Sequence, residues 1–304
     1  MRILVLGFTG YLGGHVAGQL RALGGVRLFG GGRSAGADLS VDLATADPAR
    51  LAETLADFAP DTVVNCAGAV GGDAVTLAEV NARGPAVLCA ALRDAAPTAR
   101  LVHLGSAAEY GPAAPGVRVA EDAATRPVAP YGATKLAGTV AVASSGLDAV
   151  VLRVGNPVGP GAPAQSLPGG TALRLHRAGG DPGAVVRFGD LSAHRDFVDV
   201  RDVARAVALA TTATGPLPRI LNISGGRGVP IRDLVDGLVQ VAGFRGRIDE
   251  AGSGSARSAG VDWQCSDITA AADSLGWEPR HDLSDALATL WASVASDAEL
   301  DPVP

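Results

Sequence analysis

The stretch that decides the fold stands at the N-terminus: RILVL at residues 2–6 runs directly into GFTGYLGG at residues 7–14. Gly7, Gly10 and Gly13 form a Gly-x-x-Gly-x-x-Gly pattern, and the helical stretch HVAGQLRAL follows. A turn from a strand into a helix needs residues that accept positive φ and let the backbone approach a pyrophosphate, which binds the free N–H groups at the helix start. The pattern therefore predicts a dinucleotide site in the first βα unit.

Beyond this unit, short apolar segments alternate with helical ones. The segments VRLFG, DTVVNCAG, RLVHLGS and DAVVLRVGN are apolar almost throughout, and helices are predicted between them at 10–23, 48–58, 74–95 and 131–144. Continuous apolar strands are typical of a parallel sheet that is covered on both faces. The fold class is therefore α/β, with a doubly wound parallel sheet of the Rossmann type.

The regular alternation of strands and helices ends at Asn156, where the Gly- and Pro-rich segment NPVGPGAPAQSLPGG begins. Helices are predicted in the remainder at 171–177, 203–211, 231–241 and 283–294. We expect a smaller C-terminal substrate-binding lobe there. The predicted division is a cofactor-binding Rossmann domain of residues 1–155 and 196–225 and a lobe of residues 156–195 and 226–304.

Composition limits the possible functions. The 304 residues are 47% apolar, yet no apolar run is long enough to span a bilayer, and the first one is cut by Gly7 without a cleavage signal. We therefore expect a cytoplasmic protein. The net charge of −6 argues against nucleic acid and anionic membranes as partners. The cysteines Cys66, Cys89 and Cys265 are widely spaced without a metal-ligand pattern, which predicts reduced packing residues and no metal.

The segment YGATK holds Lys135, the only lysine in a chain whose other 24 basic residues are arginine. A compact ammonium and a planar guanidinium are not interchangeable at a tight site, so we expect position 135 to be a site at which arginine cannot replace lysine. Tyr131 lies four residues earlier and shares one helix face with Lys135. A nearby ammonium favours tyrosinate and lowers the phenol pKa from about 10 toward the range useful for proton transfer.

The second predicted strand carries the signal for cofactor choice. It ends in GGGRS, and no acid occurs before Asp38. In NAD-binding proteins an acid at this point binds the ribose 2′-hydroxyl, whereas an arginine accommodates the 2′-phosphate of NADP. Arg33 therefore predicts NADP(H) as the preferred cofactor, with NAD(H) possible.

Taken in order, the motifs resemble those of extended short-chain dehydrogenases/reductases of the NAD(P)-dependent epimerase/dehydratase family. The resemblance spans nearly the whole chain and rests on the glycine pattern, Asp42-Leu43, NCAG, EVNARG, LGSAAEYG, YGATK, NPVGPG, HRDFVDVRDVARA and LGWEP. It implies the catalytic residues Ser106, Tyr131 and Lys135. The implied cofactor-binding residues are Gly7, Thr9, Gly10, Tyr11, Leu12, Gly13, Arg33, Asp42, Leu43, Cys66, Ala67, Gly68, Asn81, Leu104, Tyr131, Lys135 and Asn156. The implied substrate-binding residues are Ser106, Ala107, Asn156, Arg195 and Arg257.

The residues after Ser106 narrow the reaction. Family members that dehydrate 4-keto sugars resemble Thr-Asp-Glu here, whereas this chain has Ala107 and Ala108, which cannot move protons. The segment around Arg195 most resembles GDP-4-dehydro-6-deoxymannose reductases. The expected function is therefore an NADPH-dependent ketoreductase of a nucleotide-activated 4-keto-6-deoxysugar. An ion pair of Arg195 with Asp196 or Asp199 is the alternative to a phosphate contact.

Other functions stay open. Gly155 replaces a common aromatic residue of the family and aromatics are 4% of the chain, which favours a polyketide or other secondary-metabolite ketone as the alternative substrate. A nucleotide-sugar 4-epimerase with bound NAD needs the same three residues, and a non-catalytic NADP sensor needs none of them. The resemblance also implies a homodimer that pairs through the helix of Tyr131 and the helix near residues 80–95.

Overall fold

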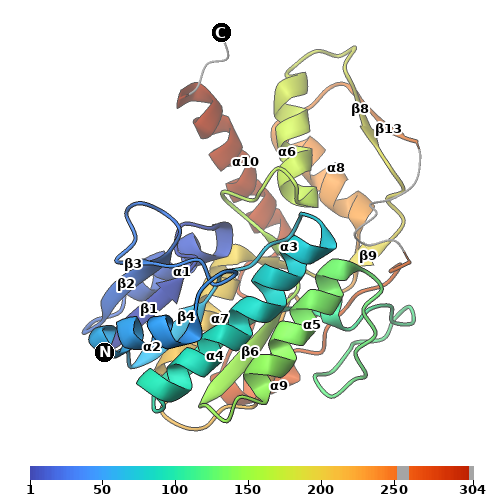
Figure 1. The fold of residues 1–304 in the computed structure, drawn as a ribbon. Coiled ribbons are helices and arrows are strands. Elements are labelled where there is room, and N and C mark those ends of the chain that lie inside the picture. The colour runs from blue at the N-terminus through green and yellow to red at the C-terminus, as the bar shows by residue number, and fades with distance from the viewer. Residues whose placement is uncertain (252–259, 301–304) are drawn as a thin grey trace.

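A seven-stranded parallel sheet forms the centre of the computed structural model, which describes residues 1–251 and 260–300 (Figure 1). The strand order is β3-β2-β1-β4-β5-β6-β11, and every neighbouring pair is parallel. The order reverses between β1 and β4, as in a doubly wound fold. The predicted fold class is thus confirmed. The strands are β1 (Arg2–Leu6), β2 (Arg27–Gly32), β3 (Leu39–Ser40), β4 (Thr62–Asn65), β5 (Arg100–Ser106), β6 (Ala149–Val154) and β11 (Ile220–Ile223).

Helices cover both faces of the sheet, so each face carries its own apolar core (Figure 1). One core lies under α1 (Tyr11–Arg21), α7 (Val200–Thr212) and α9 (Thr269–Leu275). The other lies under α2 (Pro48–Phe58), α4 (Gly84–Ala95) and α5 (Pro130–Ala143). Burial on both faces explains why the strands read as continuous apolar runs.

The helix expected over 74–95 is interrupted. It consists of α3 (Ala74–Ala78), a π-helical turn over Glu79–Arg83, and α4. A π turn inserts one extra residue per turn and is frequent at functional sites. Here it contains Asn81, which is buried and faces α5.

A third apolar core lies outside the sheet. It is built from α6 (Leu167–Ala178), α8 (Ile231–Ala242) and α10 (Leu283–Leu300), with the strand pair β8 (Val185–Phe188) and β13 (Arg247–Glu250) beside them (Figure 1). Two small ladders are separate from the central sheet: β7 (Asn156–Val158) with β10 (Phe197–Asp199), and β9 (His194–Arg195) with β12 (Val229–Pro230). Trp277 and α9 pack on the sheet core, although both belong to the segment 226–304 that was assigned to the substrate-binding lobe from the sequence. The exact domain boundaries stay a prediction. Among the described helices, none is both long enough and apolar enough to cross a membrane.

Candidate active site

The turn after β1 is as tight as the glycine pattern predicts. Gly7 has φ +76°, and its carbonyl accepts a hydrogen bond from the Gly10 N–H at 2.9 Å. A Cβ atom on Gly13 would lie 2.0 Å from that carbonyl oxygen, and one on Gly7 would lie 2.9 Å from the Ala67 backbone nitrogen. Gly10 caps α1 without any side-chain hydrogen bond. The N–H groups at the start of α1 are therefore available to an anion such as a pyrophosphate.

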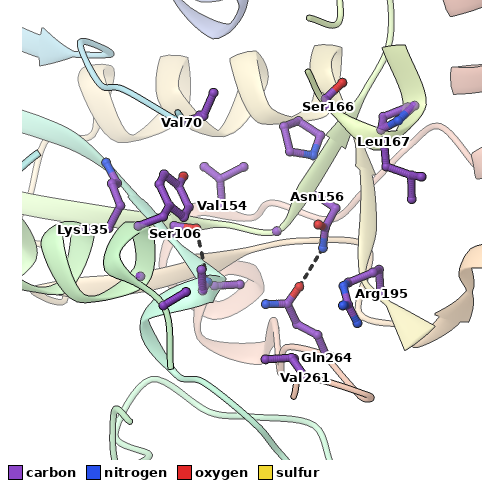
Figure 2. Close-up of a pocket in the computed structure, with 18 of the residues that line it drawn as sticks. Val70, Ser106, Lys135, Val154, Asn156, Ser166, Leu167, Arg195, Val261 and Gln264 are labelled. Atoms are coloured by element: carbon purple, nitrogen blue, oxygen red, sulfur yellow. Dashed lines mark hydrogen bonds between the residues drawn. The ribbon is translucent and has the colours of Figure 1, made fainter. Parts of the chain in front are cut away.

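One cavity of about 1100 Å³ lies between this turn and the third core. It brings together fifteen of the residues singled out above, namely Gly10, Tyr11, Leu12, Gly13, Cys66, Ala67, Gly68, Asn81, Leu104, Ser106, Ala107, Tyr131, Lys135, Asn156 and Arg195. Figure 2 shows Ser106 and Lys135 on one side and Asn156 and Arg195 on the other. These residues come from the carboxyl ends of strands, from helices and from loops that are far apart in the chain, so only the fold brings them together.

Lys135 lies on the cavity side of α5 and is only 5% exposed. Its ammonium donates to the Leu104 carbonyl of β5 at 2.5 Å. Burial lowers the pKa of Lys135 below its usual 10.5, while the Glu109 carboxylate and the Cys66 thiol counteract this effect. Tyr131 begins the same helix one turn earlier and also lines the cavity. The helix thus presents both side chains to one space, as their spacing predicts.

Ser106 ends β5 and starts a short 3-10 turn over Ala107–Glu109. Its Oγ accepts a hydrogen bond from the Ala108 N–H at 3.2 Å, and its own N–H donates to the Glu109 carboxylate at 2.7 Å. A serine hydroxyl has one donor and two acceptor positions. Because the Ala108 bond uses one acceptor position, the hydroxyl proton remains available to an oxygen atom in the cavity.

Asn81 holds the loop that lines the cavity after β4. Its Oδ1 accepts from the Ala69 N–H at 2.9 Å, and its Nδ2 donates to the Ala69 carbonyl at 2.8 Å and to Thr134 Oγ1 at 3.4 Å. A Cβ atom on Gly68 would lie 4.0 Å from Lys135 Nζ. The π turn therefore fixes this loop against α5 near the ammonium.

Besides Gly7, four predicted cofactor residues lie outside the cavity lining: Thr9, Arg33, Asp42 and Leu43. The Thr9 and Ser34 hydroxyls form a hydrogen bond of 3.0 Å, which places the glycine turn beside exposed Arg33. Asp42 and Leu43 follow β3 in a loop that the Arg83 guanidinium holds. This guanidinium donates to three carbonyls of the loop, those of Leu43, Ala44 and Ala46.

Asp38, the first acid after β2, has a structural contact. Its carboxylate accepts a hydrogen bond from the Gly30 N–H at 2.7 Å. Asp38 therefore stabilises the end of β2.

Tyr11 supports a ligand at the glycine turn. Its hydroxyl is buried and, within the described residues, has no hydrogen-bond partner. Burial, together with the nearby Asp199 carboxylate, raises the pKa of this phenol, so it stays a donor. A buried donor without a partner is costly, and a bound polar ligand would remove the cost. The glycine turn, the free helix N–H groups and this donor together fit a dinucleotide.

The far side of the cavity is polar and cationic. Asn156 Nδ2 donates to Gln264 Oε1 at 2.8 Å, and Arg195 lies beside them (Figure 2). Arg195 is 7% exposed and donates to the His194 carbonyl at 2.7 Å. Gln264 was not among the predicted site residues because its segment has no periodicity that would place it. Arg257 lies outside the described residues.

The alternative role of Arg195 as an ion-pair partner is wrong for both acids considered. Asp196 accepts hydrogen bonds from the backbone N–H groups of Ser266 and Arg227, and Asp199 pairs with Arg201 at 2.6 Å. Across residues 1–251 and 260–300, Arg195 forms no ion pair. Burial lowers the pKa of its guanidinium, and only the charge of Asp262 counteracts this. A buried cation of this kind favours an anionic ligand.

Gly155 leaves no room for the aromatic residue that is common in the resembling family. A Cβ atom there would lie 2.0 Å from Ser224 Oγ and 2.8 Å from the Asp196 carbonyl oxygen. The Ser224 side chain is completely buried and occupies this space. The substitution is therefore compensated inside the fold, and it does not by itself enlarge the cavity.

A Rossmann sheet whose cavity contains a serine, a tyrosine and a lysine in this arrangement defines a short-chain dehydrogenase/reductase. A family model described as NAD dependent epimerase/dehydratase family matches residues 3–224. The chain belongs to this family, and it is an NAD(P)-dependent enzyme of the oxidoreductase class.

Individual proteins resemble the chain over nearly its full length. It is 37% identical over 305 residues to the dTDP-6-deoxy-L-talose 4-dehydrogenase (NAD(P)(+)) of Kitasatospora kifunensis, covering 96% of this chain and 95% of that protein. The structure of RMD from Pseudomonas aeruginosa, complexed with NADPH, superposes with a TM-score of 0.84 at 23% identity and covers 97% and 99% of the two chains. The UDP-glucose 4-epimerase of Thermus thermophilus, in complex with NAD, gives a TM-score of 0.83 at 26% identity and the same two coverages.

Proposed function

We propose that this chain is an NADPH-dependent ketoreductase that acts on C4 of a nucleotide-activated 4-keto-6-deoxysugar. The observation that carries the proposal is the cavity itself. Its one side holds Ser106, Tyr131 and Lys135, and its other side holds Arg195, a buried guanidinium that forms no ion pair within the described residues. A ketone at the first side and a diphosphate at the second would use both. The relative from Kitasatospora kifunensis is named for the reverse type of reaction, at position 4 of a dTDP-6-deoxysugar.

The chain's own residues supply the proton and hold the reacting oxygen. When bound, the nicotinamide supplies the hydride. The Tyr131 hydroxyl gives the matching proton to the substrate oxygen, and the free hydroxyl proton of Ser106 steadies that oxygen from the other direction. The Lys135 ammonium, one turn along α5, stabilises the tyrosinate that results. Leu104, whose carbonyl accepts from Lys135, ties the ammonium to β5.

The test of the substrate class uses the cationic side of the cavity. Purified protein is assayed with NADPH and a panel of nucleoside-diphosphate 4-keto-6-deoxyhexoses, and a free nucleoside diphosphate is then added as a competitor. Arg195→Gln should raise KM about tenfold or more, since a charge-assisted hydrogen bond contributes about 1.5–3 kcal/mol. A polyketide ketone as substrate predicts no competition by the diphosphate. Arg232→Gln is a control, because Arg232 is half-exposed and pairs with Glu250, and neither of these two residues lines the cavity.

A 4-epimerase is the second candidate, because the Thermus thermophilus structure shares the fold and is an epimerase with NAD. The two functions differ in whether the cofactor is consumed. Net loss of NADPH with accumulation of a 4-hydroxy product supports the reductase. Interconversion of two 4-hydroxy sugars without net change in nicotinamide, by protein that retains NAD during purification, would replace it with the epimerase.

A further inference from the structure

Glu109 is a buried acid that directly follows the cavity-lining residues Ala107 and Ala108, yet it does not line the cavity itself. Its side chain is completely buried, and it lies on the inner side of the 3-10 turn that Ser106 caps. The cavity is lined instead by its neighbours Ala107 and Ala108. Glu109 therefore cannot transfer a proton to a substrate. The hydrogen bonds of its carboxylate indicate a different role.

The carboxylate of Glu109 connects three elements. Oε1 accepts from the Ser106 N–H at the end of β5 at 2.7 Å and from the Thr139 hydroxyl of α5 at 2.9 Å. Oε2 pairs with Arg153 of β6 at 2.8 Å, and both partners of that ion pair are buried. A Cβ atom on Gly105 would lie 2.8 Å from Oε1, so a glycine at that position makes room for the carboxylate.

The positions of these partners relate Glu109 to the reaction. Thr139 lies one helical turn after Lys135 on α5, and two turns after Tyr131. Ser106 donates its backbone N–H to this carboxylate, and the same residue lines the cavity. One carboxylate thus sets the distance between the strand that carries Ser106 and the helix that carries Tyr131 and Lys135.

We propose that Glu109 is a positioning residue of the ketoreductase: its buried carboxylate links the Ser106 backbone to α5 and keeps a negative charge near the Lys135 ammonium. The expected effect on kcat rests on the proposed function, whereas the expected effect on the pH titration of Lys135 does not. A buried ion pair contributes little net stability compared with apolar side chains of similar volume, so stability alone does not explain this one.

The charges around Lys135 make the electrostatic part measurable. The titratable groups described near its ammonium are Glu109 in the 3-10 turn after β5, the Cys66 thiol after β4, His103 of β5 and, one turn earlier on α5, Tyr131. Burial raises the pKa of Cys66 to about 12 and lowers that of His103 well below 6.5, so both are neutral at pH 7. Glu109 is then the negative charge that helps to keep this buried lysine protonated.

Two double variants separate the hydrogen bond from the charge. Glu109→Gln with Arg153→Gln removes both charges but keeps an oxygen for the Ser106 N–H. Glu109→Leu with Arg153→Met removes the bond as well, and it replaces the buried ion pair by apolar side chains without leaving a charge unpaired. We expect kcat of the Leu/Met variant to fall about 100-fold with KM changed less than about threefold, because a small misplacement of reacting groups has such an effect. The Gln/Gln variant should retain more of kcat.

The second readout needs no substrate. Because Lys135 is the only lysine of the chain, protein labelled with ¹³C at lysine Cε gives one side-chain resonance, whose pH titration reports this ammonium alone. Both double variants should move its midpoint to lower pH. Asp148→Asn is the control, because Asp148 pairs with Arg100 at the opposite end of β5. It should change neither kcat nor the titration.

The outcomes are distinct. A folded Leu/Met variant with wild-type kcat, or an unshifted Lys135 titration in both variants, overturns the role of Glu109. If the wild type reduces none of the sugars, the proposed function fails, whereas the titration still decides the inference. If the Leu/Met variant does not fold, the Gln/Gln variant decides it by the same titration.

Discussion

At the scale of single residues, Arg33 provides the test of cofactor preference. It is exposed directly after β2, where no acid competes for a ribose, since Asp38 is bonded to the Gly30 backbone. Arg33→Ala should raise KM for NADPH about tenfold and leave KM for NADH nearly unchanged, as expected for loss of one charge-assisted hydrogen bond to a 2′-phosphate. Initial rates with both cofactors measure this. An equal change in KM for both cofactors would mean that Arg33 does not bind the 2′-phosphate.

The reacting side chains could be predicted from the sequence better than the residues around them. Ser106, Tyr131 and Lys135 were found because they stand in motifs, and the fold brings them to one cavity. Glu109 was missed although Ser106-x-x-Glu109 has the spacing of a capping box, which the structure contains. The contact of Asn156 with Gln264, 108 positions apart in the chain, has no local signal at all.

At the scale of elements, the glycine turn can be tested against a matched neighbour. Gly13→Ala places a Cβ atom 2.0 Å from the Gly7 carbonyl oxygen, so β1 and α1 must move apart and dinucleotide affinity should fall more than about tenfold. Gly14→Ala meets only the Phe8 carbonyl oxygen at 3.8 Å and should bind normally, with stability raised by about 0.5–1 kcal/mol. Fluorescence titration with NADPH compares the two. Normal binding by the Gly13 variant would remove the turn from the cofactor site.

Long periodic helices were predicted closely, and short or irregular elements were not. The predicted 48–58 and 231–241 agree with α2 and α8 within one residue. The short α9 and the four-residue strands β8 and β13 were missed, because such lengths give no clear periodicity. The π turn could not be predicted from a 3.6-residue pattern. α7 begins at Val200, three residues earlier than predicted, because Asp199 caps it.

At the scale of the whole molecule, the predicted homodimer can be tested at exposed valines of α5 and α3. Val140 of α5 is 56% exposed and Val75 of the neighbouring α3 is 65% exposed. Val140 lies on the helix through which the pairing is expected, so burial of its side chain would favour such an interface. Val140→Glu should convert a dimer into a monomer in light scattering, whereas Val241→Glu, on α8, should not. A wild-type protein that is monomeric at micromolar concentration would contradict the expectation.

Global stability should also depend on pH through Asp196. Burial raises its pKa from 3.8 to about 6 in the folded protein. Between these pH values the folded state therefore retains a proton that the unfolded state releases. The resulting contribution to the free energy of unfolding is present below pH 4 and is lost as pH rises through about 6. It amounts to about 3 kcal/mol. Denaturant unfolding of wild type and Asp196→Asn should give free energies whose difference changes by most of this amount between pH 4 and 7. A constant difference would show that Asp196 titrates normally.

The central claim is that Tyr131 is the proton donor for reduction of a sugar ketone by NADPH. The most direct measurement follows nicotinamide absorbance with a nucleoside-diphosphate 4-keto-6-deoxyhexose for wild type and Tyr131→Phe, and NADPH affinity in parallel. The account predicts rapid turnover by wild type, a loss of at least about 100-fold in the variant, and nearly equal NADPH affinity in both. Wild-type-like turnover by the phenylalanine variant would contradict it.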